Sequence, residues 1–474
     1  MSKRLIGIIL IVICTAAYYF LTTEPATSAI WEAEFEDKIL SEPIPVSGNF
    51  VFWGGNKGKN IYKLYLINSS GQKIAESQNL PHMPFDPIVV GDNIIMADRG
   101  RMVRAFSSAD LKVLWEVASN DPLERAPTKC DVPTMVVENG IFVKKTFPSV
   151  LQMSGKSIFC FNSKTGKQEW DVTVIDDIKD YAADNVLVVI HGYKDIKNPV
   201  WRCSGYDLED GIELWKLEQP VSKETPIFVK NACVLTSSEG EAIAVEQKTG
   251  EVLLKNDAKG HIAIKALDEG VILVNQSYTN FAYWSLRTGK SWTSTMKKDF
   301  VGAVQIGSCL IFADKTSIRC FNIDSGENLW QKELGDVYGL YPHRNGVFVT
   351  YKEDFSSRTT YGACLGADSN ANLWLSKGTS IFRKPCITAE GDLLLNYDGS
   401  IRLMPKPVFK TLSNTTVPDV AMPDPTAKVN KVFEAKTASE TKPLPKKADK
   451  KEDKNTNQAI PTELSPVSDE DAGW

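Results

Sequence analysis

The four histidines are the first residues to test for chemistry, because imidazole is both a common metal ligand and a common general base. His82, His191, His261 and His343 stand far apart in the chain. No zinc-type cysteine spacing and no Cys-x-x-Cys-His motif for covalent haem accompanies them. The sequence therefore predicts no metal ligands, and each histidine is expected to be a surface or hydrogen-bonded loop residue.

Two other stretches have residue types suited to ion binding. The segment DLEDG at 207–211 is similar to a calcium loop, but Gly211 is fifth from Asp207, where that loop needs its glycine sixth. The segment WGGNKGK at 53–59 has the composition of a phosphate cradle, but it lies between two predicted strands, whereas a phosphate loop opens a helix. Both segments are therefore predicted to be turns.

Nucleophilic catalysis also lacks a local signature. No G-x-S-x-G elbow marks a serine, so no Ser/His/Asp arrangement can be proposed from the sequence. The predicted set of catalytic residues is empty, which favours a protein that is not an enzyme.

Ten-residue stretches of one pattern recur along the chain and must position any functional group. They are FNSKTGKQEW, YDLEDGIELW, VEQKTGEVLL and FNIDSGENLW, which end at Trp170, Trp215, Leu254 and Trp330. Recurrence at a spacing of about 40 residues is the mark of a repeat architecture. Each stretch alternates like a strand, turns at a glycine and resumes as a second strand, so each repeat is predicted to contain a β-hairpin.

Aligning the repeats yields two sets of structural residues. The turn glycines, placed where a short hairpin loop needs a positive φ, are Gly71, Gly166, Gly211, Gly250, Gly289 and Gly326. Large side chains are predicted to anchor each repeat on its neighbour. Trp170, Trp215, Leu254 and Trp330 stand four residues after a turn glycine, and Trp115 and Trp374 end the same pattern where the glycine has been replaced. The first and sixth hairpins are expected to end at Ala75 and Thr293, with Trp292 displaced by a local bulge.

Small residues stand ten positions before these anchors, and they are predicted to mark close approach between neighbouring repeats. They are Ala105, Cys160, Gly205, Ala244, Cys320 and Cys364. The other cysteines of the repeat region are Cys130, Cys203, Cys233, Cys309 and Cys386, which are expected either to form disulfides in an oxidising compartment or to remain buried thiols. The sequence assigns no pairs.

A small antiparallel sheet cannot bury both of its faces alone, so the repeats are predicted to stack into a closed β-propeller. Eight hairpins can be counted, followed by a two-stranded unit at 385–404, so a strict count of the repeats would also allow nine blades. Residues 30–35, which contain Trp31, are expected to supply the missing strand of that unit and to join the two ends of the chain in one shared blade.

The blade pattern, with a Thr-Gly turn followed by Trp, resembles the PQQ-binding-like propeller superfamily, which includes quinoprotein alcohol dehydrogenases and BamB-type proteins. The resemblance covers residues 31–405 and implies an all-β fold of about eight four-stranded antiparallel blades. In the quinoprotein dehydrogenases it implies a vicinal Cys-Cys disulfide, calcium ligands and a catalytic Asp. This chain has no Cys-Cys pair, which weakens the dehydrogenase interpretation, so no cofactor is predicted.

The chain is predicted to have three parts. Residues 1–29 contain Lys3 and Arg4 before the uncharged apolar run 5–21, which is typical of a signal peptide or an uncleaved signal anchor in the inner membrane. Residues 30–405 form the propeller. Residues 406–474 are rich in Lys, Pro and Glu and are expected to be a disordered tail. The propeller is thus expected outside the cytoplasm, in the periplasm or cell envelope.

Three functions remain open from the sequence. The leading hypothesis is a non-catalytic extracytoplasmic propeller that binds proteins as a scaffold in envelope assembly. The alternatives are a PQQ-dependent quinoprotein dehydrogenase and a ligand- or carbohydrate-binding ectodomain. The net charge of -5 is small for 474 residues and gives no reason to expect nucleic acid as a partner.

Overall fold

The computed structural model describes residues 28–138, 141–193, 200–256, 260–275, 277–344, 346–353, 359–367, 372–378, 384–397 and 400–406. Of residues 134–144, 372–378 and 397 only the backbone is described. The chain divides into two units, residues 1–409 and 410–474, and all described residues lie in the first.

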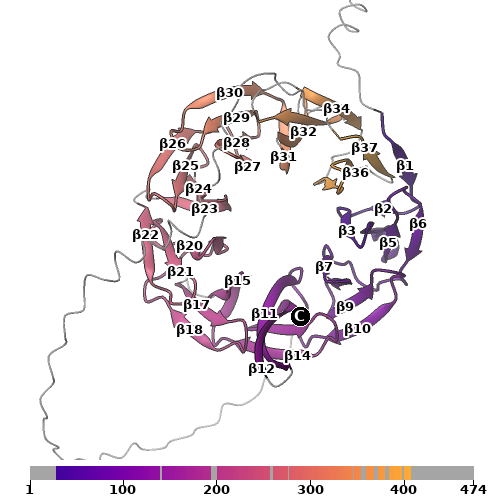
Figure 1. Ribbon diagram of the computed structural model, residues 1–474, viewed down its shortest axis with the longest axis horizontal. Helices are drawn as coiled ribbons and strands as arrows, with labels where there is room; N and C mark the ends of the chain where they lie inside the picture. The colour runs from indigo at the N-terminus through magenta and orange to yellow at the C-terminus, as the bar shows by residue number, and fades with distance from the viewer. Residues whose placement is uncertain are drawn as a thin grey trace, which may run out of the picture. The chain divides into compact units, whose positions relative to one another are not determined.

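The described strands of this unit form nine antiparallel sheets, which Figure 1 shows as the blades of a ring. The all-β propeller is confirmed, but the expected number of about eight blades is wrong. The eight hairpins of the sequence already make eight complete blades, and the unit near residue 400 is a ninth. Its four strands are β35, β36, β37 and β1, so the two ends of the propeller share one sheet.

The first four blades contain strands β2 to β18. Blade 1 consists of β2 (Lys38–Ile39), β3 (Ile44–Val46), β4 (Asn49–Asn56), the 3-10 helix η1 (Lys57–Lys59), β5 (Ile61–Ile67) and β6 (Lys73–Glu76). Blade 2 consists of β7 (Ile88–Val90), β8 (Asn93–Ala97), β9 (Met102–Ser107) and β10 (Val113–Ala118). Blade 3 consists of β11 (Thr128–Glu138), β12 (Ile141–Ser154), β13 (Ser157–Asn162) and β14 (Gln168–Thr173). Blade 4 consists of β15 (Asp177–Ala183), β16 (Val186–Gly192), β17 (Trp201–Asp207) and β18 (Glu213–Lys216).

The other five blades contain the remaining strands. Blade 5 consists of β19 (Ile227–Val229), β20 (Ala232–Thr236), β21 (Ala242–Glu246) and β22 (Val252–Asn256). Blade 6 consists of β23 (His261–Ala266), β24 (Gly270–Asn275), β25 (Asn280–Ser285) and β26 (Ser291–Thr295). Blade 7 consists of β27 (Phe300–Ile306), β28 (Cys309–Asp314), β29 (Ser317–Asn322) and β30 (Asn328–Glu333). Blade 8 consists of β31 (Asp336–His343), β32 (Gly346–Lys352), β33 (Thr360–Gly366) and β34 (Asn372–Gly378). Blade 9 consists of β35 (Cys386–Ile387), β36 (Leu393–Tyr397), β37 (Ser400–Met404) and β1 (Trp31–Glu34).

Each blade runs from the centre of the ring to its rim. In Figure 1 the first strands β15, β23, β27 and β31 lie near the centre, and the fourth strands β18, β22, β26 and β30 lie at the rim. Because successive strands alternate in direction, the two faces of the ring carry different connections. We call the face with the links between blades the inter-blade face, and the face with the turns between third and fourth strands the hairpin face.

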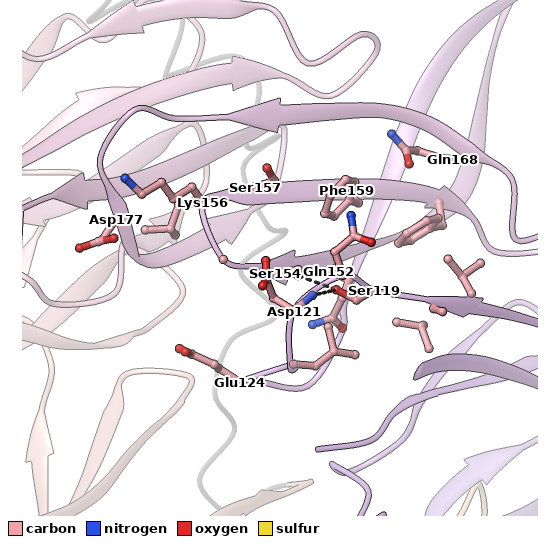
Figure 2. A pocket seen from close by; sticks show the side chains of 18 residues that line it. Ser119, Asp121, Glu124, Gln152, Ser154, Lys156, Ser157, Phe159, Gln168 and Asp177 are labelled. Atoms are coloured by element: carbon pink, nitrogen blue, oxygen red, sulfur yellow. Dashed lines mark hydrogen bonds between the residues drawn. The ribbon is translucent and has the colours of Figure 1, made fainter. Parts of the chain in front are cut away.

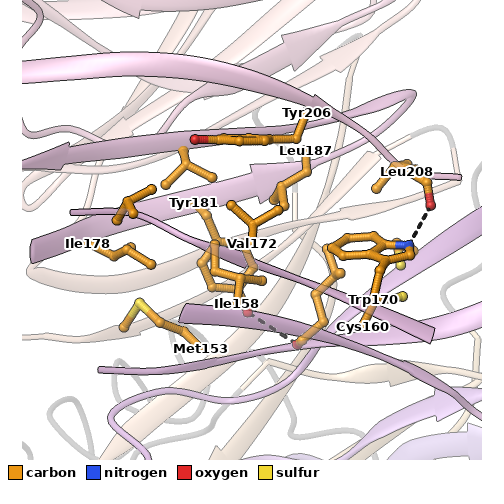
Figure 3. Close-up of a cluster of buried hydrophobic side chains, with 14 of the residues drawn as sticks. Met153, Ile158, Cys160, Trp170, Val172, Ile178, Tyr181, Leu187, Tyr206 and Leu208 are labelled. Atoms are coloured by element: carbon orange, nitrogen blue, oxygen red, sulfur yellow. Dashed lines mark hydrogen bonds between the residues drawn. The ribbon is translucent and has the colours of Figure 1, made fainter. Parts of the chain in front are cut away.

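The core of the propeller consists of separate clusters between blades. One cluster of buried apolar side chains lies between each pair of neighbouring blades around the ring, nine clusters in all among the described residues. Figure 3 shows the cluster between blades 3 and 4, where Leu187 of one blade packs near Ile158 and Val172 of the other. Each blade is therefore buried on both faces by its neighbours, which a single small sheet cannot achieve.

The N-terminal strand closes the ring. Strand β1 pairs with β37 from Trp31↔Leu403 to Glu34↔Ser400. The hydroxyl of Ser400 also donates a 2.7 Å hydrogen bond to Glu32. The expectation that residues 30–35 complete the last blade is thus confirmed, and β1 covers the edge of β37 that would otherwise be unpaired.

Candidate functional site

Four predicted anchor tryptophans, Trp115, Trp170, Trp215 and Trp330, lie on the fourth strands and reach into the next blade. Trp31 and Trp292, which the repeat pattern does not predict as anchors, do the same. The indole Nε1 of each of these six donates a hydrogen bond to a backbone carbonyl in the hairpin turn of the next blade. The donors and acceptors are Trp31 and Ser69 (3.0 Å), Trp115 and Ser163 (3.0 Å), Trp170 and Leu208 (3.0 Å), Trp215 and Gln247 (2.6 Å), Trp292 and Ile323 (2.8 Å), and Trp330 and Ala367 (3.0 Å). Figure 3 shows the bond from Trp170 to Leu208.

Five of the six predicted turn glycines lie directly under these indoles, and the sixth, Gly289, lies under the side chain of Leu254. Their φ angles are +83° at Gly71, +71° at Gly166, +76° at Gly211, +70° at Gly250, +72° at Gly289 and +74° at Gly326. A Cβ atom added at Gly166 would lie 2.6 Å from Cδ2 of Trp115. This turn therefore requires glycine for two reasons, the left-handed backbone conformation and the contact with the indole.

In blade 6 the expected anchor, Thr293, is wrong. Seven other blades have a one-residue bulge just before the anchor, which inserts an extra residue into the fourth strand. Blade 6 pairs without a bulge, from Tyr283↔Trp292 to Trp284↔Ser291, so its anchor comes one position earlier. Trp292 makes the contact with the next blade. The prediction of a bulge at this tryptophan is wrong, because blade 6 has no bulge between its third and fourth strands.

Blade 1 reverses the sizes of anchor and turn residue. Ala75 stands at the anchor position, and the turn that faces it in blade 2 has Leu111 in place of glycine, with φ of +59°. Leu111 is 3 % exposed and belongs to the cluster between blades 1 and 2, on which Ala75 packs. The leucine side chain occupies the interface where other blades place an indole.

The small residues predicted before the anchors lie opposite them within the same blade. The cross-strand pairs are Ala105↔Trp115, Cys160↔Trp170, Gly205↔Trp215, Ala244↔Leu254, Cys320↔Trp330 and Cys364↔Trp374. The side chain of Trp374 lies outside the description. At Gly205 an added Cβ would lie 2.1 Å from Cε2 of Trp215, so the small size accommodates the anchor of the same blade.

A hydrogen-bonded Asp–His–Ser chain, which no local sequence motif marks, lies inside blade 4. His191 Nδ1 is 3.3 Å from Asp176 Oδ2, and His191 Nε2 is 3.2 Å from Ser204 Oγ. Because a carboxylate only accepts hydrogen bonds, the neutral ring donates a hydrogen bond from Nδ1 to Asp176 and accepts a hydrogen bond from the Ser204 hydroxyl at Nε2. These residue types in this order can activate a serine nucleophile.

The burial of these three residues excludes a catalytic role for the Asp176–His191–Ser204 chain. Ser204 is 0 % exposed, and Asp176 and His191 are both 5 % exposed, so no substrate can reach the hydroxyl. Burial lowers the pKa of His191 and keeps the ring neutral. We interpret the chain as a buried polar network that links β17, β16 and the loop before β15.

The remaining histidines show no shared site. His343 is also buried, at 1 % exposure, and its ring donates to the carbonyl of Gly391 at 3.0 Å. The expectation of surface or loop positions is therefore wrong for His191 and His343, which are buried in strands β16 and β31, and His261, which is partly exposed, also lies in a strand, β23. Within the described residues, no three His, Cys, Asp or Glu side chains come together as a metal site. The eight described cysteines, all except Cys14, are free thiols.

The most unusual surface element is a long hairpin in blade 3. Strand β12 pairs with β13 only from Ser149 to Ser154. Beyond that point β11 and β12 pair with each other alone, from Asp131↔Pro148 to Glu138↔Ile141. We call these residues, 131–138 and 141–148, the β11–β12 ribbon. It is part of the pair of long strands labelled β11 and β12 in Figure 1.

The ribbon extends far from the blade that carries it. At about 3.3 Å per residue, its strands reach roughly 25 Å beyond the third strand, on the hairpin face. At the base, Val132 is 4 % exposed in the cluster between blades 3 and 4, whereas its cross-strand partner Phe147 is 37 % exposed. In contrast, β27 and β28 of blade 7 meet at a short turn after the pair Ile306↔Cys309.

The predicted terminal segments lie outside the described residues, both the apolar run 5–21 and the tail from residue 407 onward. Among the residues that are described, no helix has the length and apolar character needed to cross a membrane.

Solved structures with a similar fold include three kinds of protein. BamB from Moraxella catarrhalis is 12% identical, with 70% of this chain and 96% of that chain covered and a TM-score of 0.45. The computationally designed Ika8 protein is 12% identical, with 70% and 99% covered and a TM-score of 0.45. A quinohemoprotein alcohol dehydrogenase from Comamonas testosteroni is 10% identical, with 82% and 78% covered and a TM-score of 0.46. Likeness of this degree says nothing about activity or partners.

Sequence comparison is more specific. No curated protein matches the chain. A family model described as outer membrane protein assembly factor BamB matches residues 22–174, 138–261 and 238–344, which together cover more than half of the 474 residues. With its PQQ-like blades and this match, the chain belongs to the BamB family of β-propellers.

Proposed function

We propose that this protein is a non-catalytic, extracytoplasmic scaffold that binds another protein through the β11–β12 ribbon. The observation that carries the proposal is the ribbon itself, whose eight cross-strand pairs have no third strand beside them among the described residues. A two-stranded hairpin in water is marginally stable, and its outer edges present unpaired backbone groups. A partner that adds a strand to an edge satisfies those groups, which is a common mode of protein recognition.

Two observations support the location. The basic and apolar residues at 3–21 have the order of a signal peptide or an anchor with its N-terminus in the cytoplasm. Membership of the family described as outer membrane protein assembly factor BamB supports a role in envelope assembly. The membrane is then a second contact if residues 5–21 remain uncleaved, and protein is the expected partner class.

The sequence left two alternative functions open. No observation on the described part of the chain favours the PQQ-dependent dehydrogenase. A cavity between blades 2 and 3 supports ligand binding as a property additional to the scaffold.

Shortening the ribbon tests the proposal. Pro133 and Thr146 are cross-strand partners, so replacing residues 134–145 by Asn-Gly joins them through a two-residue hairpin turn. Because the ribbon is paired only with itself, the melting temperature of the purified propeller is expected to stay within about 2 °C of the wild type. Chemical crosslinking in intact cells, followed by purification, is expected to recover the partner with the wild type and to lose it with the short variant.

The matched control places the same dipeptide in another blade, with Asn-Gly in place of Gly307 and Ser308 in the β27–β28 turn. This variant is expected to crosslink like the wild type. Recovery of the same partner by the shortened variant would show that the ribbon does not bind it.

A further inference from the structure

A cavity of about 670 Å³ lies between blades 2 and 3 (Figure 2). Its walls are the loop between β10 and β11, the turn between β12 and β13, and the start of β15, so it lies on the inter-blade face. The apolar cluster between blades 2 and 3 has seven buried residues, whereas the cluster between blades 3 and 4 has fifteen. The packing between these two blades therefore leaves room for another molecule.

The wall of this cavity contains a buried side-chain amide whose carbonyl oxygen accepts no hydrogen bond from the described residues. Gln152 is 1 % exposed, and its Nε2 donates to the carbonyls of Arg125 (3.2 Å) and Met153 (3.0 Å). Its Oε1 has no hydrogen-bond partner among the described residues. Leaving a buried acceptor unpaired costs free energy, so this oxygen favours a ligand that brings a hydrogen-bond donor.

The charged groups of the cavity favour a cation. Asp121, Glu124 and Asp177 line it, and none of them forms an ion pair with a described cation. Lys156 is the one cation in the lining, and its Nζ donates at 2.7 Å to the carbonyl of Ile175. Figure 2 shows Asp121 and Glu124 on the loop side of the cavity, near Gln152 and Ser154.

One wall of the same cavity is apolar. The ring of Phe159 is partly exposed and lies beside Phe161, with 6.2 Å between the ring centroids. Val103 and Val117 of blade 2 complete this wall. A ligand in the cavity can thus place hydrocarbon against the rings and a charged end against the carboxylates.

We propose that this cavity binds a primary ammonium group on a short aliphatic stem. An ammonium has three N–H donors and no acceptor, which matches an unpaired amide oxygen and nearby carboxylates. The stem packs on Phe159. A free alkyl diamine and the lysine side chain of a bound protein share this chemistry. The cavity and the β11–β12 ribbon lie on opposite faces, so the two proposals fail independently.

The test is calorimetric titration of the full-length protein with two amines, cadaverine and Nα-acetyl-lysine amide. We expect saturable one-to-one binding of at least one of them at millimolar concentration. Binding of cadaverine identifies a free amine as sufficient, and binding of the acetyl-lysine amide alone identifies a protein lysine as the source. Glutarate and 1-pentanol are five-carbon chains that carry two carboxylates or a single hydroxyl and no ammonium group, and they are expected not to bind.

Two variants connect the binding to the cavity. The Asp121→Asn/Glu124→Gln variant changes exposed loop residues, and it is expected to weaken amine binding by about tenfold or more, as charge-assisted hydrogen bonds are lost. The control Glu239→Gln/Glu251→Gln removes the same charge from exposed positions of blade 5 and is expected to bind like the wild type. Gln152→Met keeps the length of the stem and is expected to weaken binding as well.

Three results would overturn the proposal. They are no binding of either amine at millimolar concentration, equal binding of glutarate or 1-pentanol, and unchanged amine affinity in Asp121→Asn/Glu124→Gln. The affinity of Asp121→Asn/Glu124→Gln for the amines tests the proposal even if Gln152→Met fails to fold.

Discussion

Replacing Gly166 by alanine is expected to destabilise the propeller by about 3 kcal/mol, because two costs add at this turn. The first is the left-handed backbone conformation, with φ of +71°. It costs an alanine about 1 kcal/mol. The second is the indole of Trp115, whose Cδ2 would lie only 2.6 Å from the new Cβ.

The second cost follows from how the indole is held. A Cβ atom in ordinary contact stays about 3.5 Å or more from a carbon atom, so the indole must move by about 1 Å. That movement strains the 3.0 Å hydrogen bond from Trp115 to the carbonyl of Ser163. Overpacking of this kind costs about 1–3 kcal/mol, and we take about 2 kcal/mol here.

Gly307 supplies the matched control. Its φ is +57°, and an added Cβ would meet no atom within 4 Å. Gly307→Ala therefore has the backbone cost alone, about 1 kcal/mol. The difference of about 2 kcal/mol between the two variants measures the contact with the indole.

Hydrogen exchange followed by mass spectrometry is the appropriate assay. A ring of nine blades can open in stages, so a single unfolding free energy is not defined, whereas exchange reports the local opening of blades 2 and 3. Combining Gly166→Ala with Trp115→Ala should reduce the cost of the glycine substitution to about 1 kcal/mol. Equal effects of Gly166→Ala and Gly307→Ala would refute the reasoning, and so would a cost that persists without Trp115.

Three further predictions concern other parts of the ring. Burial lowers the pKa of His191, so below about pH 6.5 the unfolded chain binds more protons than the folded protein, and stability falls as the pH decreases. Thermal unfolding at a series of pH values should show a smaller fall in His191→Gln, and an equal fall in both proteins would contradict this. Trp292→Phe loses the bond to Ile323 and should lower the free energy of local opening of blades 6 and 7, measured by hydrogen exchange, by about 1 kcal/mol, whereas Thr293→Ala at the exposed neighbour should lower it by less than about 0.5 kcal/mol. Leu111→Gly relieves a strained φ of +59° but loses a buried side chain, so we expect a net loss of about 2 kcal/mol, and a gain in stability would show that strain outweighs packing.

The blade pattern could be predicted from the sequence because it depends on short-range residues. A turn glycine and an anchor four residues later belong to one hairpin, so their spacing is visible in the chain. The displaced position of Trp292 was also visible, but its meaning was not. Only the strand register shows that seven other blades contain a bulge and that blade 6 does not.

The features most relevant to function depend on contacts between distant segments. The Asp176–His191–Ser204 chain joins residues of different strands and loops, with no shared motif. The length of β11 and β12 depends on which residues pair and on where the third strand ends. The cavity between blades 2 and 3 is space that side chains of two blades leave unfilled, and no residue spacing encodes it.

Site-specific photocrosslinking in intact cells tests most directly whether the ribbon is the protein-binding element. A photoreactive amino acid at Thr146, an exposed position on β12, is compared with the same amino acid at Ser308 in the short β27–β28 turn of the same face. We predict a discrete higher-mass adduct from position 146 and none from position 308. The absence of an adduct from position 146, or the same adduct from both positions, would contradict the proposed role.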